Sequence, residues 1–192
     1  MLLPSSDAAV TTKRILKVNH AGETGAIKIY GAQLFLARRR FPHIVPELDA
    51  MRTDEIEHCR LFREAMPARS ARPCRVMALW SLGGYVLGLA TALLGERMIW
   101  VCTEAVEATV HRHLEAQLAF LNTRDAGLHG MILSIQSEEL AHLHEARHRQ
   151  AGEKRFSDRM AYWIIAAATE TLIWLSTWGD SGWMVPEMAL RR

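Results

Sequence analysis

A repeated spacing of glutamates and histidines constrains this sequence more than any other feature. Two Glu-x-x-His pairs stand out, in the segments DEIEH and EELAH, because a lone glutamate precedes each of them by 32 residues. Residues i and i+3 share one face of a helix, so each pair can hold one metal ion through an oxygen and a nitrogen. The two sets are Glu23 with Glu55 and His58, and Glu107 with Glu139 and His142.

A single Glu-x-x-His pair is a weak signal, because a chain with nine histidines should contain one by chance. Glu145 and His148 form such a pair, and the residue 32 positions before Glu145 is His113, not a carboxylate. The doubled set with equal spacing matches the ligands of di-iron carboxylate bundles. These take a Glu from each of two helices and a Glu-x-x-His motif from each of the other two. We therefore expect an all-α, ferritin-like four-helix bundle.

The predicted carboxylate ligands need a counter-charge. Glu23 lies among small residues in HAGETGA and Glu107 among apolar ones in CTEAVEATV, so both are expected to be buried. Buried carboxylates repel one another unless cations neutralise them. Two divalent metal ions balance four negative charges and leave two neutral imidazoles as nitrogen donors. Oxygen-rich sites with few imidazoles suit iron or manganese, and Glu55, Glu107 and Glu139 are the candidates to bridge two ions.

Helix signals run through the whole chain, whereas strand signals are nearly absent. Prolines, glycines, capping residues and basic runs mark the expected helix ends. We interpret the 192 residues as a single ferritin-like domain, and the tail after Gly179 is expected to be loosely ordered. The predicted bundle helices cover about residues 7–40, 46–65, 96–121 and 125–150, and two additional apolar helices cover about 76–95 and 159–178.

The segment 76–95 carries no charged side chain and is long enough to cross a bilayer. Predicted metal ligands lie on both sides of it, so a single crossing would separate the two halves of one site. Two interpretations remain for the segments 76–95 and 159–178: an ordinary buried pair, or two helices in contact with the membrane surface. We favour membrane contact, because the tryptophans and the flanking arginines suit a headgroup boundary.

Composition and charge exclude several classes of protein. A net charge of +2 without a basic and aromatic stretch argues against a nucleic-acid partner. Cys59, Cys74 and Cys102 form no CxxC motif, which predicts free thiols in a reducing compartment. The first residues resemble neither a signal peptide nor a transit peptide, so we expect a bacterial cytoplasm or a mature organellar form.

Several residues near the predicted ligands have two interpretations. Gly22, Gly25 and Gly31 allow either close approach of a flat substrate or tight packing of a neighbouring helix. His20 and His113 either orient ligands and relay protons or are hydrogen-bonded surface histidines, and we favour the surface. The acids beside the ligands, Asp54, Glu57 and Glu138, are expected to face solvent. Asp54 or Glu138 can still orient a neighbouring imidazole.

These segments resemble the demethoxyubiquinone hydroxylases, the Coq7 family of quinone-biosynthesis monooxygenases. The similarity lies in RILKVNHAGETGAIKIYGAQ, DEIEHCRLF, ALWSLGGYVLGLATALLG, CTEAVEATVHRHLEAQL and SEELAHLHEA, over about residues 13–150. The family's ligand motifs fall on the same six glutamates and histidines. Thr24 and Leu114 depart from the family, because many relatives have tyrosine at the first position and some at the second. If either tyrosine assists electron or proton transfer in those relatives, this chain must use another route.

The resemblance implies a membrane-attached 3-demethoxyubiquinol 3-hydroxylase that hydroxylates the ring of a polyprenyl methoxy-methyl-benzoquinol. Two iron ions, cycling between Fe2+ and Fe3+, and O2 as co-substrate are implied, with NADH as a candidate reductant. Membrane lipid, a Coq9-like lipid-binding protein and a second copy of the chain are expected partners. The expected place is the cytoplasmic face of a bacterial inner membrane, or the matrix face of the mitochondrial inner membrane. The alternatives are a ferritin-like peroxidase or ferroxidase, and a non-enzymatic membrane-bound subunit of a quinone-biosynthesis complex.

Overall fold

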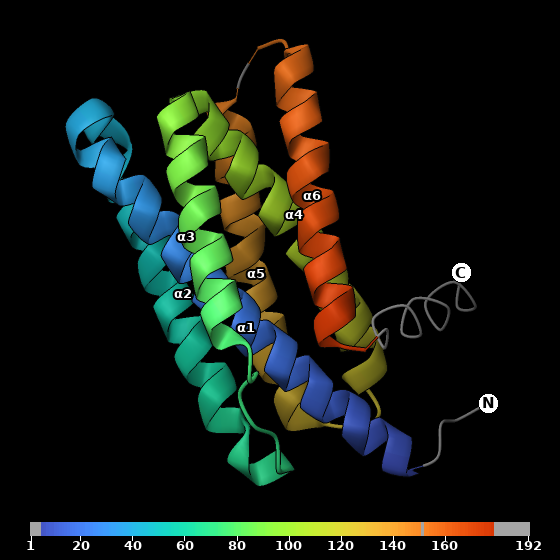
Figure 1. The fold of residues 1–192 in the computed structure, drawn as a ribbon. Helices are drawn as coiled ribbons and strands as arrows, with labels where there is room; N and C mark the ends of the chain where they lie inside the picture. Colours follow the sequence, from blue (N-terminus) through green and yellow to red (C-terminus); the bar gives the residue numbers. More distant parts are fainter. Residues whose placement is uncertain (1–4, 151, 179–192) are drawn as a thin grey trace.

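The computed structural model describes residues 5–150 and 152–178, and all regular structure in this part of the chain is helical (Figure 1). The prediction of an all-α fold is confirmed. The tail after Gly179, expected to be loosely ordered, lies outside the described residues. The helices are α1 (Ser5–Arg40), α2 (Val45–Ala65), α3 (Met77–Leu94), α4 (Glu96–Leu121), α5 (Ala126–Arg149) and α6 (Phe156–Ser176), with short 3-10 turns at Pro42–Ile44 and Pro67–Arg69.

Local sequence explains where these helices begin and end. Gly95 joins α3 directly to α4 with a φ of 114°, a conformation that favours glycine. The Asp125 side chain accepts a hydrogen bond from the Leu128 N–H at 3.0 Å and so caps α5. The start of α6 was predicted three residues too late. Asp158 accepts from the Arg155 N–H at 3.0 Å and stabilises the first turn from inside the helix.

The bundle is built from two similar halves. In the first half α1 packs against α2 and α3, and in the second half α4 packs against α5 and α6 (Figure 1). Two apolar layers fill the space between the bundle helices, one around Leu16 and Phe120 and the other around Leu34 and Trp100. On each bundle helix the predicted metal ligands fall between these two layers. A polar layer therefore lies between two hydrophobic cores.

Two glycines bring α3 against the backbone of α1. A Cβ atom on Gly84 would lie 2.3 Å from the Gly25 carbonyl oxygen, and one on Gly88 would lie 2.3 Å from the Ile29 carbonyl oxygen. Gly25 thus packs its backbone against α3, where a Cβ of its own would lie 3.4 Å from the Trp80 ring, and it also lines the cavity described below. By contrast, a Cβ on Gly22 would meet nothing within 4 Å, although Gly22 lines a cavity described below.

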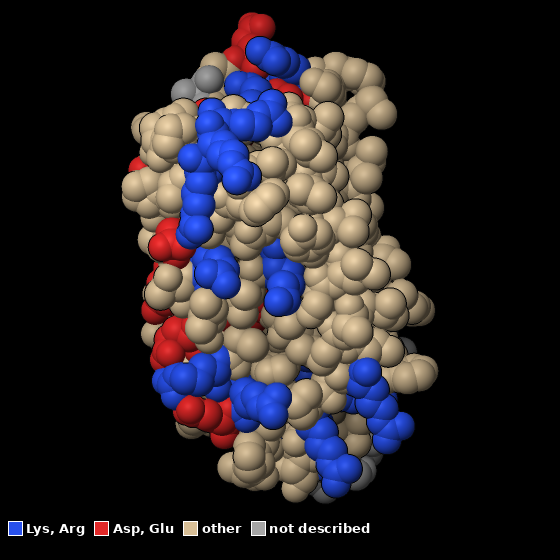
Figure 2. All heavy atoms as spheres, turned by 60° about the vertical axis from the view of Figure 1, so that its left-hand side comes forward, with Lys and Arg blue, Asp and Glu red and all other residues tan. Residues whose placement is uncertain are grey.

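The apolar helices α3 and α6 keep many large side chains exposed. Among the described helices, α3 is long and apolar enough to cross a membrane by length and composition, which alone is weak evidence, and only 22% of it is buried. The exposed apolar side chains of α3 and α6 argue against the interpretation of these helices as an ordinary buried pair. On the face shown in Figure 2, Lys and Arg gather toward both ends, beside a broad area without charge. The most exposed apolar side chains of the two helices include Leu79, Leu82, Leu94, Phe156, Trp163 and Ile164.

Candidate metal centre

The structure brings the six predicted ligands together in the polar layer. One potential ligand atom from each of Glu23, Glu55, His58 and Glu139 lies within 4.8 Å of the others, and all four residues are buried. A second group of four lies equally close and consists of Glu55, Glu107, Glu139 and His142. The two groups share Glu55 and Glu139. The arrangement offers two adjacent cation positions with two carboxylates common to both.

Burial and repulsion disfavour the charged form of two carboxyl groups in this cluster, Glu23 and Glu107. Burial raises the pKa of Glu23 well above its usual range, and repulsion by Glu55 and Glu139 adds to the effect. Burial, with Glu139 and Glu55 again nearby, does the same to the pKa of Glu107. Both carboxylate oxygens of Glu55 and of Glu139 are buried without a hydrogen-bond partner. Unpaired buried oxygens at this density fit a metal centre, because cations satisfy them directly.

The two histidines turn their Nδ1 atoms toward these carboxylates. His58 Nδ1 lies 3.1 Å from Glu139 Oε1, and His142 Nδ1 lies 3.6 Å from Glu55 Oε1. Burial lowers the pKa of both imidazoles, but the carboxylates of Glu139 and Glu55 outweigh it and raise the pKa of His58 to about 11 and that of His142 to about 12. Protons on these imidazoles provide the charge that a metal provides otherwise. A cation bound at this place would displace those protons.

The outer nitrogen of each histidine meets a carboxylate from the opposite helix. His58 Nε2 lies 2.9 Å from Glu138 Oε2, and His142 Nε2 lies 3.1 Å from Asp54 Oδ2. With the proton on Nε2 donated to the carboxylate, the Nδ1 lone pair is free to face a metal. The prediction that Asp54 or Glu138 orients an imidazole is confirmed for both. Glu57 faces solvent as expected and accepts a hydrogen bond from Arg60.

Tyr30 is a part of the site that the sequence reasoning missed. Its phenol O–H donates to Glu107 Oε1 at 2.8 Å, and the residue is buried. Burial, followed by the charge of Glu107, raises the pKa of Tyr30 well above its usual value, so the phenol stays protonated and remains a donor. Its position two helical turns after Glu23, on the same face of α1, was the available signal.

The two positions that depart from the family pattern lie in different surroundings. The Thr24 hydroxyl donates to the His20 carbonyl oxygen of its own helix at 2.9 Å. Leu114 is buried in the apolar layer with Leu16 and Phe120. Neither residue offers a tyrosine-like hydroxyl to the cluster.

The expectation that His20 and His113 lie on the surface is wrong, because both are buried. No helix end and no charge pattern near either histidine distinguishes it from a surface residue. His113 Nε2 lies 3.0 Å from Glu170 Oε1, a contact that joins α4 to α6. The third Glu-x-x-His pair, Glu145 and His148, lies outside the cluster as predicted. Glu145 accepts a hydrogen bond from Arg149 at 2.6 Å, and His148 is exposed.

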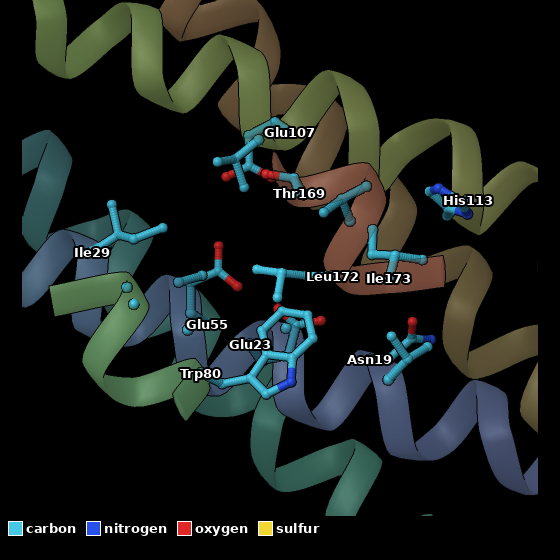
Figure 3. Close-up of a pocket in the computed structure, with 18 of the residues that line it drawn as sticks. Asn19, Glu23, Ile29, Glu55, Trp80, Glu107, His113, Thr169, Leu172 and Ile173 are labelled. Atoms are coloured by element: carbon cyan, nitrogen blue, oxygen red, sulfur yellow. The ribbon is translucent and has the colours of Figure 1, made fainter. Parts of the chain in front are cut away.

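A cavity of about 290 Å³ lies beside the cluster. All four glutamates of the cluster line it, and Figure 3 shows Glu23, Glu55 and Glu107 on one side, with Trp80 and Leu172 drawn close to them, and Asn19 and His113 on the other side. Its walls come mainly from α1, α3, α4 and α6 and are largely apolar. Leu79 and Leu172 line the cavity and are 65% and 45% exposed, so the cavity opens at the surface between α3 and α6.

Comparisons with known proteins agree with this geometry. The family model described as "Ubiquinone biosynthesis protein COQ7" matches residues 10–176. The NADPH-dependent 3-demethoxyubiquinone 3-hydroxylase of Rattus norvegicus, a mitochondrial protein, is 36% identical over 133 residues, which cover 67% of this chain and 60% of the relative. The 3-demethoxyubiquinol 3-hydroxylase of Rhodospirillum rubrum is 37% identical over 134 residues, covering 70% and 63%.

A third relative matches over a longer stretch. The NADPH-dependent 3-demethoxyubiquinone 3-hydroxylase of Dictyostelium discoideum, also mitochondrial, is 34% identical over 175 residues, covering 86% of this chain and 76% of the relative. The matched part of the rat protein is shorter, at about three fifths of its length. The family model spans all six helices, including every residue of the buried glutamate and histidine cluster. The chain therefore belongs to the family of the ubiquinone biosynthesis protein COQ7.

Proposed function

We propose that this chain is a di-iron, O2-dependent monooxygenase that hydroxylates the ring of a polyprenyl methoxy-methyl-benzoquinol, as a 3-demethoxyubiquinol 3-hydroxylase. One observation carries the proposal: the four carboxylates of a buried cluster that also contains two imidazoles line an apolar cavity. The names of the relatives supply the substrate class and the reaction.

Two iron ions would be held by the six residues of the cluster, with Glu55 and Glu139 common to both positions. When bound, they supply the activation of O2 and the redox change that ring hydroxylation needs. The protein holds the ligands still. Glu138 and Asp54 fix the Nε2 side of the two imidazoles, and Tyr30 holds one oxygen of Glu107. The apolar walls exclude water from the reacting ring.

The size and opening of the cavity support a substrate with a ring and a long apolar tail. About 290 Å³ accommodates one substituted ring but not a polyprenyl chain as well, since sites for whole drug-sized ligands begin at roughly this volume. The mouth lies between Leu79 and Leu172, on the exposed apolar helices α3 and α6. The ring would therefore enter from a lipid phase while the tail stays along these helices.

This arrangement supports peripheral attachment to a membrane. The exposed tryptophans of α6 and the basic side chains near both ends suit an interface with anionic lipid. A reduced nicotinamide is the proposed electron source, because two of the relatives are named as NADPH-dependent. The Coq9-like partner and the homo-oligomer stay predictions. A peroxidase, a ferroxidase or a non-enzymatic subunit would leave the apolar cavity beside the carboxylates without a role.

The test combines metal content with turnover. Purified protein, reconstituted with ferrous iron without oxygen, is expected to bind two iron ions per chain and to convert a short-chain demethoxyubiquinol to its hydroxylated product when O2 is admitted. The same chain should restore ubiquinone in a host that lacks this step, measured by mass spectrometry of quinones.

Two variants distinguish the buried cluster from the Glu-x-x-His pair at the surface. Glu139→Ala removes a carboxylate common to both metal positions and should abolish iron binding and turnover. Glu145→Ala removes the glutamate of the surface Glu-x-x-His pair and should change neither. Full iron content and turnover in Glu139→Ala would contradict the assignment, and iron binding without any hydroxylated product would contradict the reaction.

A further inference from the structure

The cavity has a second polar end that the metal site does not use. Asn19 on α1 and Gln117 on α4 line it together with His113, and Figure 3 shows Asn19 and His113 on the side away from Glu55 and Glu107. The two amides form a reciprocal pair. Asn19 Nδ2 donates to Gln117 Oε1 at 2.7 Å, and Gln117 Nε2 donates to Asn19 Oδ1 at 3.0 Å.

The pair lies in surroundings where polar groups are costly. Gln117 is 1% exposed, and the neighbouring layer is apolar, with Leu16, Leu114 and Ile132. A buried amide loses its hydrogen bonds to water. It stabilises the fold only to the extent that hydrogen bonds within the protein replace them. Apolar side chains at both positions would fill the same space without this cost. The position of the pair therefore indicates a use beyond joining α1 to α4.

Each amide keeps unused hydrogen-bonding capacity. A primary amide has two N–H donors and two carbonyl lone pairs, and the reciprocal pair uses one of each. Among the described residues, no further partner is seen for either side chain. The third polar group at this end is less available, because His113 Nε2 is already engaged by Glu170. The amide pair thus offers both a donor and an acceptor to a molecule in the cavity.

We infer that Asn19 and Gln117 bind a ring oxygen of the substrate and thereby determine which ring carbon faces the carboxylate cluster; this rests on the proposed function. A quinol hydroxyl can donate to an amide carbonyl, and a quinone oxygen can accept from an amide N–H, so the pair recognises both redox states. With one oxygen held at this end and apolar walls beside it at Trp80 and Leu172, rotation of the ring is restricted. Asn19 and Gln117 are in this sense substrate-orienting residues.

The test compares two soluble probes on iron-loaded protein without reductant, so that no turnover occurs. One probe is a short-chain methoxy-methyl-benzoquinone, and the other is the same substituted ring without the two quinone oxygens. Binding is measured by calorimetry. Gln117→Leu should weaken quinone binding roughly tenfold, the upper end for one lost hydrogen bond, and leave binding of the probe without quinone oxygens unchanged. Equal effects on both probes would overturn the inference.

Two further variants guard against a purely structural effect. Asn19→Leu changes a half-buried position, so it can be tested even if Gln117→Leu folds poorly. It should likewise reduce the preference for the quinone over the probe without quinone oxygens. Gln33→Leu removes the hydrogen bond of another buried side-chain amide, from Gln33 Nε2 to Thr91 Oγ1 at 3.2 Å. Gln33 does not line the cavity. It should leave the preference for the quinone intact.

Turnover separates this inference from the proposed function. In the unaltered protein a single hydroxylated product is expected, whereas Gln117→Leu should give a mixture of ring positions with a raised KM. If the unaltered protein hydroxylates the quinol and both amide variants give the same single product with the same KM, the inference fails while the proposed function stands. If the unaltered protein binds iron and never hydroxylates a quinol, the proposed function fails first.

Discussion

The imidazole Nε2 of His142 on α5 lies 3.1 Å from the Oδ2 of Asp54 on α2. The reverse contact joins His58 on α2 to Glu138 on α5, at 2.9 Å. Each of the two helices therefore supplies one histidine to the cluster and one carboxylate that holds the other helix's histidine. This crossed arrangement fixes both rings against rotation, although the two carboxylates are themselves about half exposed.

Removing either outer carboxylate should weaken metal binding without removing a ligand. Asp54→Ala and Glu138→Ala are each expected to lower iron affinity about 10- to 100-fold, because the imidazole loses both its orientation and part of its basicity. Competition with a chelator of known affinity measures the change. Glu57→Ala, an acid on the same helix that pairs with Arg60 at the surface, is the matched control. Unchanged affinity in both test variants would show that the contacts do not orient the rings.

The contact between α3 and α1 should not tolerate a single methyl group at its closest point. Gly84→Ala places a Cβ 2.3 Å from the Gly25 carbonyl oxygen, and the resulting overpacking is expected to cost about 2–3 kcal/mol. Gly83→Ala, one residue earlier, meets nothing within 4 Å and should stabilise the helix by about 0.5–1 kcal/mol. Denaturant unfolding of both variants compares the two values. A stable Gly84→Ala protein would mean that α3 can shift away from α1.

The exposed face of α6 should govern attachment to lipid. Trp163 and Ile164 are 69% and 63% exposed, so replacing both with serine removes apolar surface that the fold itself does not bury. Partitioning onto anionic vesicles, measured by sedimentation, is expected to fall at least tenfold, since each large side chain contributes on the order of 1 kcal/mol or more when buried in lipid. The control is Leu133→Ser on α5, at 51% exposure. Equal losses from both changes would place the lipid contact elsewhere.

The ion pair between Asp125 and Arg69 gives a pH-dependent contribution to stability. Arg69 Nη2 lies 2.8 Å from Asp125 Oδ1, and this bond lowers the pKa of the aspartate below its ordinary value. A lowered carboxyl pKa stabilises the folded state above the unfolded-state value near 4, and the contribution disappears as pH falls through the lower folded-state value. Asp125→Asn keeps a capping oxygen for α5 but loses the charge.

The free energy of unfolding of Asp125→Asn is therefore expected to be about 1 kcal/mol lower than that of the unaltered protein at pH 7, since both partners are partly exposed. The difference should shrink toward zero in acid. Denaturant titrations at several pH values measure it, with Asp49→Asn, at an exposed acid of α2, as the control. A difference that stays constant with pH would assign the effect to packing.

Much of the fold and of the cluster was predictable because the determining signals are local. Helical spacing places Glu55 beside His58 on one face, and equal separations along the chain place each lone glutamate opposite a pair. Gly95, Pro42 and Asp125 mark helix ends through their own backbone or capping chemistry. The start of α6 was misplaced because Asp158 caps from inside the helix, a pattern that looks like a cap three residues further on.

The features that were missed depend on contacts between distant parts of the chain. Helical spacing places Tyr30 on the same face of α1 as Glu23, but the contact of its hydroxyl with Glu107, 77 residues later, depends on how α1 and α4 pack. The burial of His113 follows from α6 covering it, and the Asn19–Gln117 pair follows from the meeting of α1 and α4. A resemblance to known proteins finds ligands by motif, but side chains that meet only after the helices pack need the folded structure.

The division of the bundle into two similar halves has a consequence for how the centre is assembled. Glu23, Glu55 and His58 come from the half before Gly95, and Glu107, Glu139 and His142 come from the half after it, while each cation position draws on both. A nascent chain that has not yet produced α4 and α5 has no complete position for an ion. If the cluster holds metal ions as proposed, neither position can reach its full ligand set before both halves have been synthesised.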